Sequence, residues 1–252
     1  MGRLGLRGPR NLRAHAVRLA GRLDRMSLDL HPGEVTVLCG PNGAGKSSLM
    51  LCLAGLLVPD DGGVTIDGVA LERIAPRERA RLLAYLVQSG DVAWDMDVAT
   101  LVALGRLPWP GGGGPAVEAA MAALDLGDLA RRLISTLSAG EKGRAMLARV
   151  LAGEPDWILA DEPLAHLDRH HAGALMAALR VRAQEGCGVV VAMHDLALAM
   201  QHADRVLVMA RGVLVADGVP VEALRADVLR DVWGMEVQWP EEGGGWRLAA
   251  VP

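Results

Sequence analysis

Eight consecutive residues carry the clearest chemical pattern in this chain: Gly40, Pro41, Asn42, Gly43, Ala44, Gly45, Lys46 and Ser47. They have the G-x-x-x-x-G-K-[ST] spacing of a phosphate-binding loop. Glycines let the backbone turn tightly, so that its N–H groups face phosphate oxygens. Lys46 is one of only two lysines, and its flexible ammonium group can follow the β- and γ-phosphates. The Ser47 hydroxyl is a ligand for Mg²⁺. This phosphate loop predicts binding of a nucleoside triphosphate.

The residues on either side of the phosphate loop have the patterns of a strand and a helix. Val35–Cys39 is a short apolar run, and Ser48–Leu57 has an apolar helical pattern. A helix that opens near Gly45 turns its positive N-terminal end toward the phosphates. The backbone of Gly43–Ser48 would position these phosphates, so Ser48 is also a candidate binding residue. The alternative is a glycine-rich turn that only joins a strand to a helix.

Two adjacent carboxylates end a second apolar strand. Trp157–Ala160 is followed directly by Asp161 and Glu162. In a parallel sheet, this strand end lies beside the phosphate loop, at the ligand crevice. Asp161 can hold the magnesium shell, and Glu162 can accept a proton from an attacking water. The alternative is a solvated turn at Asp161-Glu162-Pro163.

The signature segment, Leu137–Glu141, opens a helix shortly before that strand. Ser138 can cap the helix together with Glu141 three residues later, which is an ordinary capping box. A helix N-terminus with small residues is also a ready anion site. Taken alone, these residues favour the cap.

Composition limits the classes of function. The 252 residues have a net charge of −4, which argues against nucleic acid as the main partner. The longest apolar run, Leu49–Val58, is too short to span a bilayer, and the Arg-rich start shows no secretory leader. The three cysteines have no metal-ligand or redox spacing, which fits a reducing cytosol. We therefore expect a cytoplasmic protein.

Strand and helix patterns alternate along the chain, which implies a mainly parallel sheet covered on both faces. The predicted strands are Met26–Leu30, Val35–Cys39, Val64–Ile66, Ala84–Val87, Trp157–Ala160, Val189–Met193 and Arg205–Met209. The predicted helices are Pro76–Leu83, Ala139–Ala152 and Asp168–Glu185, with a helix-rich block Asp97–Arg132 interrupted by a surface loop at Gly111–Gly114. The stretch to about Leu23 is poorly patterned. In the tail Pro220–Pro252, we interpret Trp233, Trp239 and Trp246 as core filler.

These residues together resemble the ATP-binding cassette (ABC) ATPases from about Ser27 to Val237. The motifs that carry the resemblance are the phosphate loop, Gln88 after a strand, Leu137–Glu141, Asp161-Glu162-Pro163, Leu167-Asp168, and His194-Asp195 after Val189–Met193. The resemblance implies an α/β fold, a P-loop NTPase with a mainly parallel core sheet, an antiparallel β region and an inserted helical subdomain. We expect one ABC ATPase domain over residues 1–252, with the helical subdomain at 89–136 and a small C-terminal appendage at 220–252.

The resemblance also implies how the site is assembled. ATP and Mg²⁺ are the expected cofactors, and a second copy of the chain completes a head-to-tail dimer. Ser138 and Gly140 then contact the γ-phosphate of the partner's nucleotide, and Glu141 and Asp168 belong with the nucleotide-binding residues.

The resemblance assigns two further polar side chains to the chemistry. Gln88 would contact magnesium and the lytic water, which makes it a catalytic and a metal-binding candidate. His194 would hold the γ-phosphate, although a lone histidine of this kind is ordinarily a capping or core residue. With Ser47 and Asp161 as the other magnesium ligands and Glu162 as the base, the set predicts a Mg²⁺-dependent ATPase.

A finer resemblance comes from Val98–Pro108 and from the tail around Trp233-Gly234-Met235. Both look like the importer cassettes that serve ferric siderophores, haem and cobalamin. This implies a membrane permease that receives motion through the Gln88–Trp109 region, an extracytoplasmic substrate-binding protein, and a position on the inner face of the cell membrane. The alternatives are a soluble ABC ATPase with a non-transport role and a regulatory nucleotide-binding module without turnover.

Three departures from the family pattern affect specific expectations. Ala139 replaces the commoner first glycine of the signature, and Leu164-Ala165-His166 replaces small hydroxyl residues before Leu167. The region Val17–Leu19, where many family members have an aromatic ring against adenine, has none. A metal site is an alternative interpretation of four side chains that are close in sequence: His166, Asp168, His170 and His171. They straddle a loop and the start of a helix, and no cysteine lies among them, which argues against a metal site.

Overall fold

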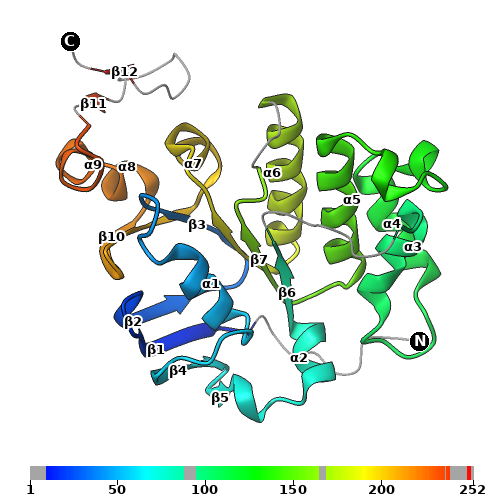
Figure 1. The fold of residues 1–252 in the computed structure, drawn as a ribbon, viewed down its shortest axis with the longest axis horizontal. Coiled ribbons are helices and arrows are strands. Elements are labelled where there is room, and N and C mark those ends of the chain that lie inside the picture. The colour runs from blue at the N-terminus through cyan, green and yellow to red at the C-terminus, as the bar shows by residue number, and fades with distance from the viewer. Residues whose placement is uncertain (1–9, 88–94, 165–168, 236, 239–248, 251–252) are drawn as a thin grey trace.

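A computed structural model describes residues 10–87, 95–164, 169–235, 237–238 and 249–250. These residues form an α/β fold with one large sheet, one smaller sheet and a two-stranded sheet in the tail, and helices pack around the large sheet (Figure 1). The mainly parallel core sheet and the antiparallel region expected from the sequence are both present. In these ranges, no helix is both long and apolar enough to cross a membrane.

The large sheet has six strands in the order β10-β9-β3-β8-β7-β6. Their bounds are β3 (Val35–Cys39), β6 (Leu83–Leu86), β7 (Trp157–Asp161), β8 (Gly188–Ala192), β9 (Arg205–Ala210) and β10 (Val213–Gly218). All are parallel except β10, which pairs antiparallel with β9. The sequence patterns do not predict β10, because its side chains alternate between exposed and half-buried and none is fully buried. Since β3, β8 and β7 are neighbours, the segments after them meet at one edge of the sheet.

The smaller sheet is antiparallel, with the order β2-β1-β4-β5. Its strands are β1 (Leu12–Leu19), β2 (Leu23–Leu30), β4 (Asp61–Ile66) and β5 (Val69–Ala70). The stretch to about Leu23, in which the sequence patterns predicted no element, therefore contains strand β1. The side chains of Leu12, Ala14 and Val17 are all buried, but the register of β1 shifts between Ala14 and Val17. A bulge of this kind breaks the two-residue period by which a strand is recognised in a sequence.

Helices cover both faces of the large sheet (Figure 1). The α-helices are α1 (Lys46–Leu53), α2 (Pro76–Leu82), α3 (Val98–Ala103), α4 (Gly114–Ala123), α5 (Ala139–Ala152), α6 (Arg169–Gln184), α7 (Leu196–His202), α8 (Pro220–Ala223) and α9 (Ala226–Trp233). Short 3₁₀ turns occupy Leu71–Arg73, Leu104–Arg106, Gly127–Leu129 and Ile134–Thr136.

Two hydrophobic cores lie on opposite faces of the large sheet. Along β3, Val35 and Val37 belong to the core that is shared with α5, α6 and α7. Leu38 points the other way, into the core that α1 shares with the antiparallel sheet. Because both faces are covered, the central strands are buried along their whole length, as parallel strands usually are.

The block between β6 and β7 is helical, as predicted. The helices α3 and α4 pack against α5 and against each other, and Leu101 and Met121 share the core of Leu147. Asp97 starts α3, because its side chain accepts a hydrogen bond from Thr100 N at 2.7 Å. The glycine loop is shorter than expected, since Gly114 already belongs to α4. The division at 89–136 stays a prediction.

The tail begins with α8 and α9, and β11 (Val237–Gln238) pairs with β12 (Ala249–Ala250). Trp233, at the end of α9, is partly buried and packs against the main core, as expected for core filler. Trp239 and Trp246 lie outside the described residues.

Candidate functional site

The phosphate loop leaves β3 and opens α1, and its shape depends on glycines at two positions. Gly40 has a φ of 156°, and a Cβ there would lie 2.3 Å from Met209 O. Gly45 has a φ of 100°, and a Cβ there would lie 2.6 Å from Arg22 O. Neither position has room for a side chain. The backbone can therefore fold closely enough to turn N–H groups of the first helical turn toward an anion.

Lys46 is buried in the centre of this loop, with 6% of its surface exposed. Its Nζ donates hydrogen bonds to Gly40 O at 2.7 Å and to Pro41 O at 3.2 Å. Burial lowers the pKa of Lys46 below its ordinary value, and the charges of Glu162 and Asp161 oppose this effect. The predicted carboxylates therefore act on the lysine charge, which places all three groups in one site.

Two serines follow Lys46 in the first turn of α1. Ser47, the predicted magnesium ligand, is exposed, whereas Ser48 is buried. The Ser47 hydroxyl is thus accessible to a ligand, and Ser48 contributes through its backbone.

Asp161 is the last residue of β7 and is 6% exposed. Its Oδ2 accepts a hydrogen bond from the Tyr85 hydroxyl at 3.1 Å. Its Oδ1 is buried and has no hydrogen-bond partner among the described residues. A buried carboxylate oxygen without a partner is costly, and a cation with oxygen ligands would satisfy it. The donor set around Asp161 therefore fits Mg²⁺.

Tyr85 is a site residue that the sequence analysis missed. It lies on β6, and burial, followed by the charge of Asp161, raises the pKa of its hydroxyl. The hydroxyl therefore stays protonated and acts as a donor. The one available signal was that Tyr85 is the only tyrosine in the chain and lies three residues before Gln88.

Glu162 and His194 contact each other across neighbouring strand ends. His194 Nε2 and Glu162 Oε1 form a hydrogen bond. Glu162 has a φ of 48°, a left-handed conformation that costs about 1–2 kcal/mol, and its N–H donates to Ala192 O of β8 at 3.0 Å. Asp195 caps α7 by accepting from Ala197 N and Leu198 N. These backbone contacts fix both side chains at the end of the sheet.

The signature segment forms the capping box that its residues favoured. Ser138 Oγ accepts from Glu141 N at 3.3 Å, and Glu141 Oε2 accepts from Ser138 N at 2.8 Å. The Ser138 N–H lowers the pKa of Glu141, and Arg132 lies 3.6 Å from the Glu141 carboxylate. Gly140 is in the first turn of α5. Among the described residues, the side chains of Ser138 and Glu141 bond to each other and to Arg132, and not to the phosphate loop.

The turn between β1 and β2 lies directly against the phosphate loop, since Arg22 O is close to Gly45. Within the region Val17–Leu19, which has no aromatic residue, the side chain of Val17 is fully buried. Leu19 is half-buried, and its carbonyl accepts from Arg22 N at 2.9 Å to close the turn. Arg18 and Leu19 are thus the accessible positions of this region, and neither has an aromatic ring.

Several predicted residues lie outside the described residues. They are Gln88, Asp168, Leu167 and His166, and the side chains of His170 and His171 are likewise not described. In the part of the chain that is described, no three His, Cys, Asp or Glu residues gather into a metal-binding group.

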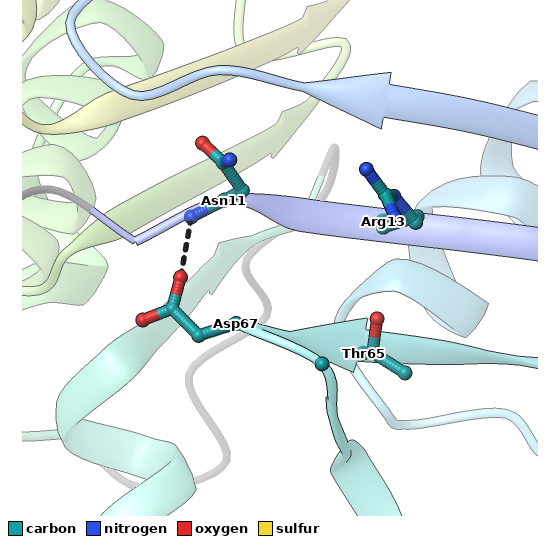
Figure 2. A pocket seen from close by; sticks show the side chains of 5 residues that line it. Asn11, Arg13, Thr65 and Asp67 are labelled. Carbon is teal, nitrogen blue, oxygen red and sulfur yellow. Dashed lines mark hydrogen bonds between the residues drawn. The ribbon is translucent and has the colours of Figure 1, made fainter.

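A hollow of about 170 Å³ lies on the antiparallel sheet, away from the strand ends that carry the site. It is lined by Asn11, Arg13, Thr65, Asp67 and Gly68. Asn11 N donates to Asp67 Oδ1 at 3.0 Å (Figure 2), and Arg13 pairs with Asp29. Because its charged groups already pair within the chain, we assign this hollow no ligand.

Comparison with known proteins shows the family of the chain. Residues 23–165 match the ABC transporter family. The Hemin import ATP-binding protein HmuV of Thermobifida fusca is 43% identical over 86% of this chain and 78% of its own length. The protein of the same name from Pseudomonas fluorescens is 41% identical over 92% of this chain and 97% of its own length.

A solved structure has the same fold as this chain. The dimeric post-hydrolysis state of an ATP-binding cassette bound to ADP and Pi has a TM-score of 0.76 and 22% identity, over 83% of this chain and 98% of the other. At this identity the match supports the fold alone. The family match and the two relatives above 40% identity also show the family. The chain belongs to the ABC transporter family.

Proposed function

We propose that this chain is the Mg²⁺-dependent ATPase subunit of an ABC importer. The observation that carries the proposal is the meeting of Lys46, Asp161, Glu162 and His194 at the ends of the adjacent strands β3, β7 and β8. A regulatory module without turnover would need no base, whereas the Glu162 carboxylate is held beside His194 at the end of β7. Hydrolysis therefore explains the geometry better than binding alone.

Each of these side chains has one task in the proposed reaction. Lys46 and the N–H groups of Gly43–Ser48 hold the phosphates of ATP. Glu162 takes the proton of the attacking water, and its contact with His194 holds the carboxylate in position. His194, which is 44% exposed, can turn to the γ-phosphate. Fixed donors and charges of this kind supply most of the rate enhancement in phosphoryl transfer.

Magnesium would be held by Asp161 and the Ser47 hydroxyl, with Gln88 as the further predicted ligand. Bound there, the ion supplies positive charge to the phosphate oxygens as negative charge develops. Oδ1 of Asp161, which has no hydrogen-bond partner among the described residues, supports this assignment. Since no metal-binding group of three acidic, His or Cys side chains exists among the described residues, the nucleotide's own phosphates would complete the shell, as is usual for Mg²⁺.

A head-to-tail pair of chains would give the signature segment its function. Within the described residues, the side chains of Ser138 and Glu141 bond to each other and to Arg132, and Gly140 lies between them in the first turn of α5. In the proposed dimer they face the partner's ATP instead, with Asp168 nearby. The N-terminus of α5 would contribute its partial positive charge to the γ-phosphate.

The segment around Trp109 would transmit the motion of α5 to the permease. Trp109 Nε1 donates to Gly153 O at 2.9 Å, just past the end of α5. The guanidinium groups of Arg81 and Arg106 both lie over its ring, at 4.9 and 4.8 Å from the ring centroid. Leu107 beside it is 72% exposed. A segment fastened to the end of α5, with an exposed apolar side chain, suits a contact with a membrane partner.

The cargo class rests on the relatives. Proteins named for hemin import are 38–43% identical to this chain, so haem is the first candidate, before a ferric siderophore or cobalamin. The permease and an extracytoplasmic binding protein would select the cargo, and the chain would act on the inner face of the membrane. The alternative, a soluble ABC ATPase without a permease, lacks such support from the relatives.

The test is reconstitution with a haem-importer permease from the same organism. We expect the two to co-purify, and ATP hydrolysis in proteoliposomes to drive uptake of haem when the cognate binding protein is present. Uptake of a siderophore or cobalamin in place of haem would change the cargo class only. A chain that hydrolyses ATP and binds no membrane protein would favour the soluble alternative, and a chain that binds ATP without releasing phosphate would refute the enzyme.

A further inference from the structure

Tyr85 connects two neighbouring strands at the level of the reaction site. It lies on β6, which runs beside β7 (Figure 1). The two strands pair in parallel, with Tyr85 opposite Leu159, two residues before Asp161. The side chain is half-buried and packs against the core that contains α1. From there its hydroxyl donates to Asp161 Oδ2 at 3.1 Å.

This hydrogen bond makes the two oxygens of Asp161 unequal. Oδ2 has a donor, whereas Oδ1 is buried and has no partner within the described residues. A carboxylate fixed through one oxygen cannot rotate freely, and its free oxygen keeps one direction. Groups that hold a metal ligand in this way typically change metal affinity by 10–100-fold when they are removed.

We propose that Tyr85 is a positioning residue for magnesium, which fixes the Asp161 carboxylate through Oδ2 and reserves Oδ1 for the ion. The proposal rests on the proposed function, since it assumes that Mg²⁺ binds with the nucleotide. It assigns Tyr85 no contact with ATP, water or the metal itself. A purely structural role, in which the ring only fills the space beside Leu159, is the competing explanation.

The two explanations differ in what the variant Tyr85→Phe does. The ring and its packing remain, and only the hydroxyl is lost. We expect Mn²⁺ binding in the presence of ADP, followed by electron paramagnetic resonance, to weaken about tenfold or more. Binding of ADP in EDTA should stay within about twofold of the parent. Unchanged Mn²⁺ affinity in a folded Tyr85→Phe protein would overturn the proposal.

A double-mutant cycle tests whether Tyr85 acts through Asp161. Asp161→Asn removes the carboxylate charge and should weaken Mn²⁺ binding strongly by itself. If Tyr85 acts only on this carboxylate, adding Tyr85→Phe to Asp161→Asn should change Mn²⁺ affinity by less than about twofold. A further tenfold loss in the double variant would show that the hydroxyl acts elsewhere and would overturn the proposal.

The unaltered protein offers a second measurement, because Tyr85 is its only tyrosine. Protein labelled with ¹³C at tyrosine Cζ gives one resonance, which reports on the hydroxyl's hydrogen bond. We expect it to shift when Mg²⁺ and ADP are added together, and not with ADP in EDTA. If ADP affinity rises with Mg²⁺ but the chemical shift of this resonance does not change, this role of Tyr85 is refuted. A protein whose ADP affinity does not respond to Mg²⁺ would instead refute the proposed function.

Discussion

Lys46 Nζ and Gly40 O are joined by a hydrogen bond of 2.7 Å, so the lysine of the phosphate loop closes back on the residue that begins the loop. Its ammonium group is buried and already has carbonyl partners. A bound phosphate would compete with these carbonyls for the same three donor hydrogens. The loop is therefore stable in the shape that receives the ligand, and the lysine need only exchange neutral acceptors for charged ones.

Lys46→Ala should weaken nucleotide binding itself. It removes a charge-assisted hydrogen bond worth about 1.5–3 kcal/mol, which corresponds to a rise in Kd of about 10- to 150-fold. Titration of the monomer with a fluorescent ATP analogue measures this. The chain provides a matched control, because Lys142 is its only other lysine and lies on α5. Lys142→Ala should bind nucleotide like the parent, and equal losses in both variants would contradict a specific role for Lys46.

Glu162→Gln should keep ATP affinity and nearly abolish turnover. The amide preserves the shape of the side chain but cannot accept a proton, and loss of a general base typically lowers rates by about 10²–10⁴-fold. Trapped ATP should then hold two chains together, visible as a dimer in size-exclusion chromatography. If the variant hydrolyses ATP at the parental rate, or stays monomeric with ATP, Glu162 is not the base.

The parts of the site that the sequence could predict are local in the chain. The spacing from Gly40 to Ser47 fixes a loop by itself, and Asp161 with Glu162 directly follows a buried strand. The hydrogen bonds of Tyr85 with Asp161 and of Trp109 with Gly153 join residues 76 and 44 positions apart. No periodicity in either segment indicates such a partner, because it depends on which strands and helices become neighbours. Strand β1 was missed for the opposite reason, since its bulge disturbs a local pattern.

Ser138→Arg separates the two roles of the signature segment. If Ser138 acts across a two-fold interface, the bulky charge should block hydrolysis at least about 100-fold and leave nucleotide binding by the monomer intact. Ser138→Ala is the control for the capping box, whose loss costs about 0.5–2 kcal/mol of stability. The ATP hydrolysis rate and the melting temperature of both variants distinguish the role at the interface from the local cap. Loss of nucleotide binding in the Ser138→Arg monomer would mean that Ser138 is only a local cap.

The buried cysteines predict a loss of stability at alkaline pH. Burial raises the pKa of Cys39 from 9.0 to about 12, and that of Cys187 likewise. Between pH 9 and 12 the unfolded chain therefore releases thiol protons that the folded chain keeps. The free energy of unfolding should fall by about 1.4 kcal/mol per pH unit for each such thiol. Urea titrations of the parent and of Cys39→Ala measure it, and the variant should show the shallower slope. Identical slopes would contradict the assignment to Cys39.

Base selectivity gives the riskiest prediction. Stacking on an aromatic ring contributes on the order of 1–3 kcal/mol per base in single-stranded nucleic-acid sites, and Leu19 offers no ring beside the turn that touches Gly45. Phosphate contacts should then dominate affinity, and they are the same for every nucleoside triphosphate. We expect kcat/KM for GTP within about tenfold of that for ATP, a difference of about 1.4 kcal/mol.

Two variants test this explanation, because the structure separates the candidate positions. Leu19→Tyr places a ring at a half-buried position beside the phosphate loop and should tighten ATP several-fold. Val17→Tyr should instead lower the melting temperature without improving ATP binding, since Val17 is fully buried and a larger side chain overpacks the core by about 1–3 kcal/mol. Steady-state kinetics with ATP and GTP on the unmodified protein is the decisive measurement. A preference for ATP of several hundredfold would mean that another residue reads the base.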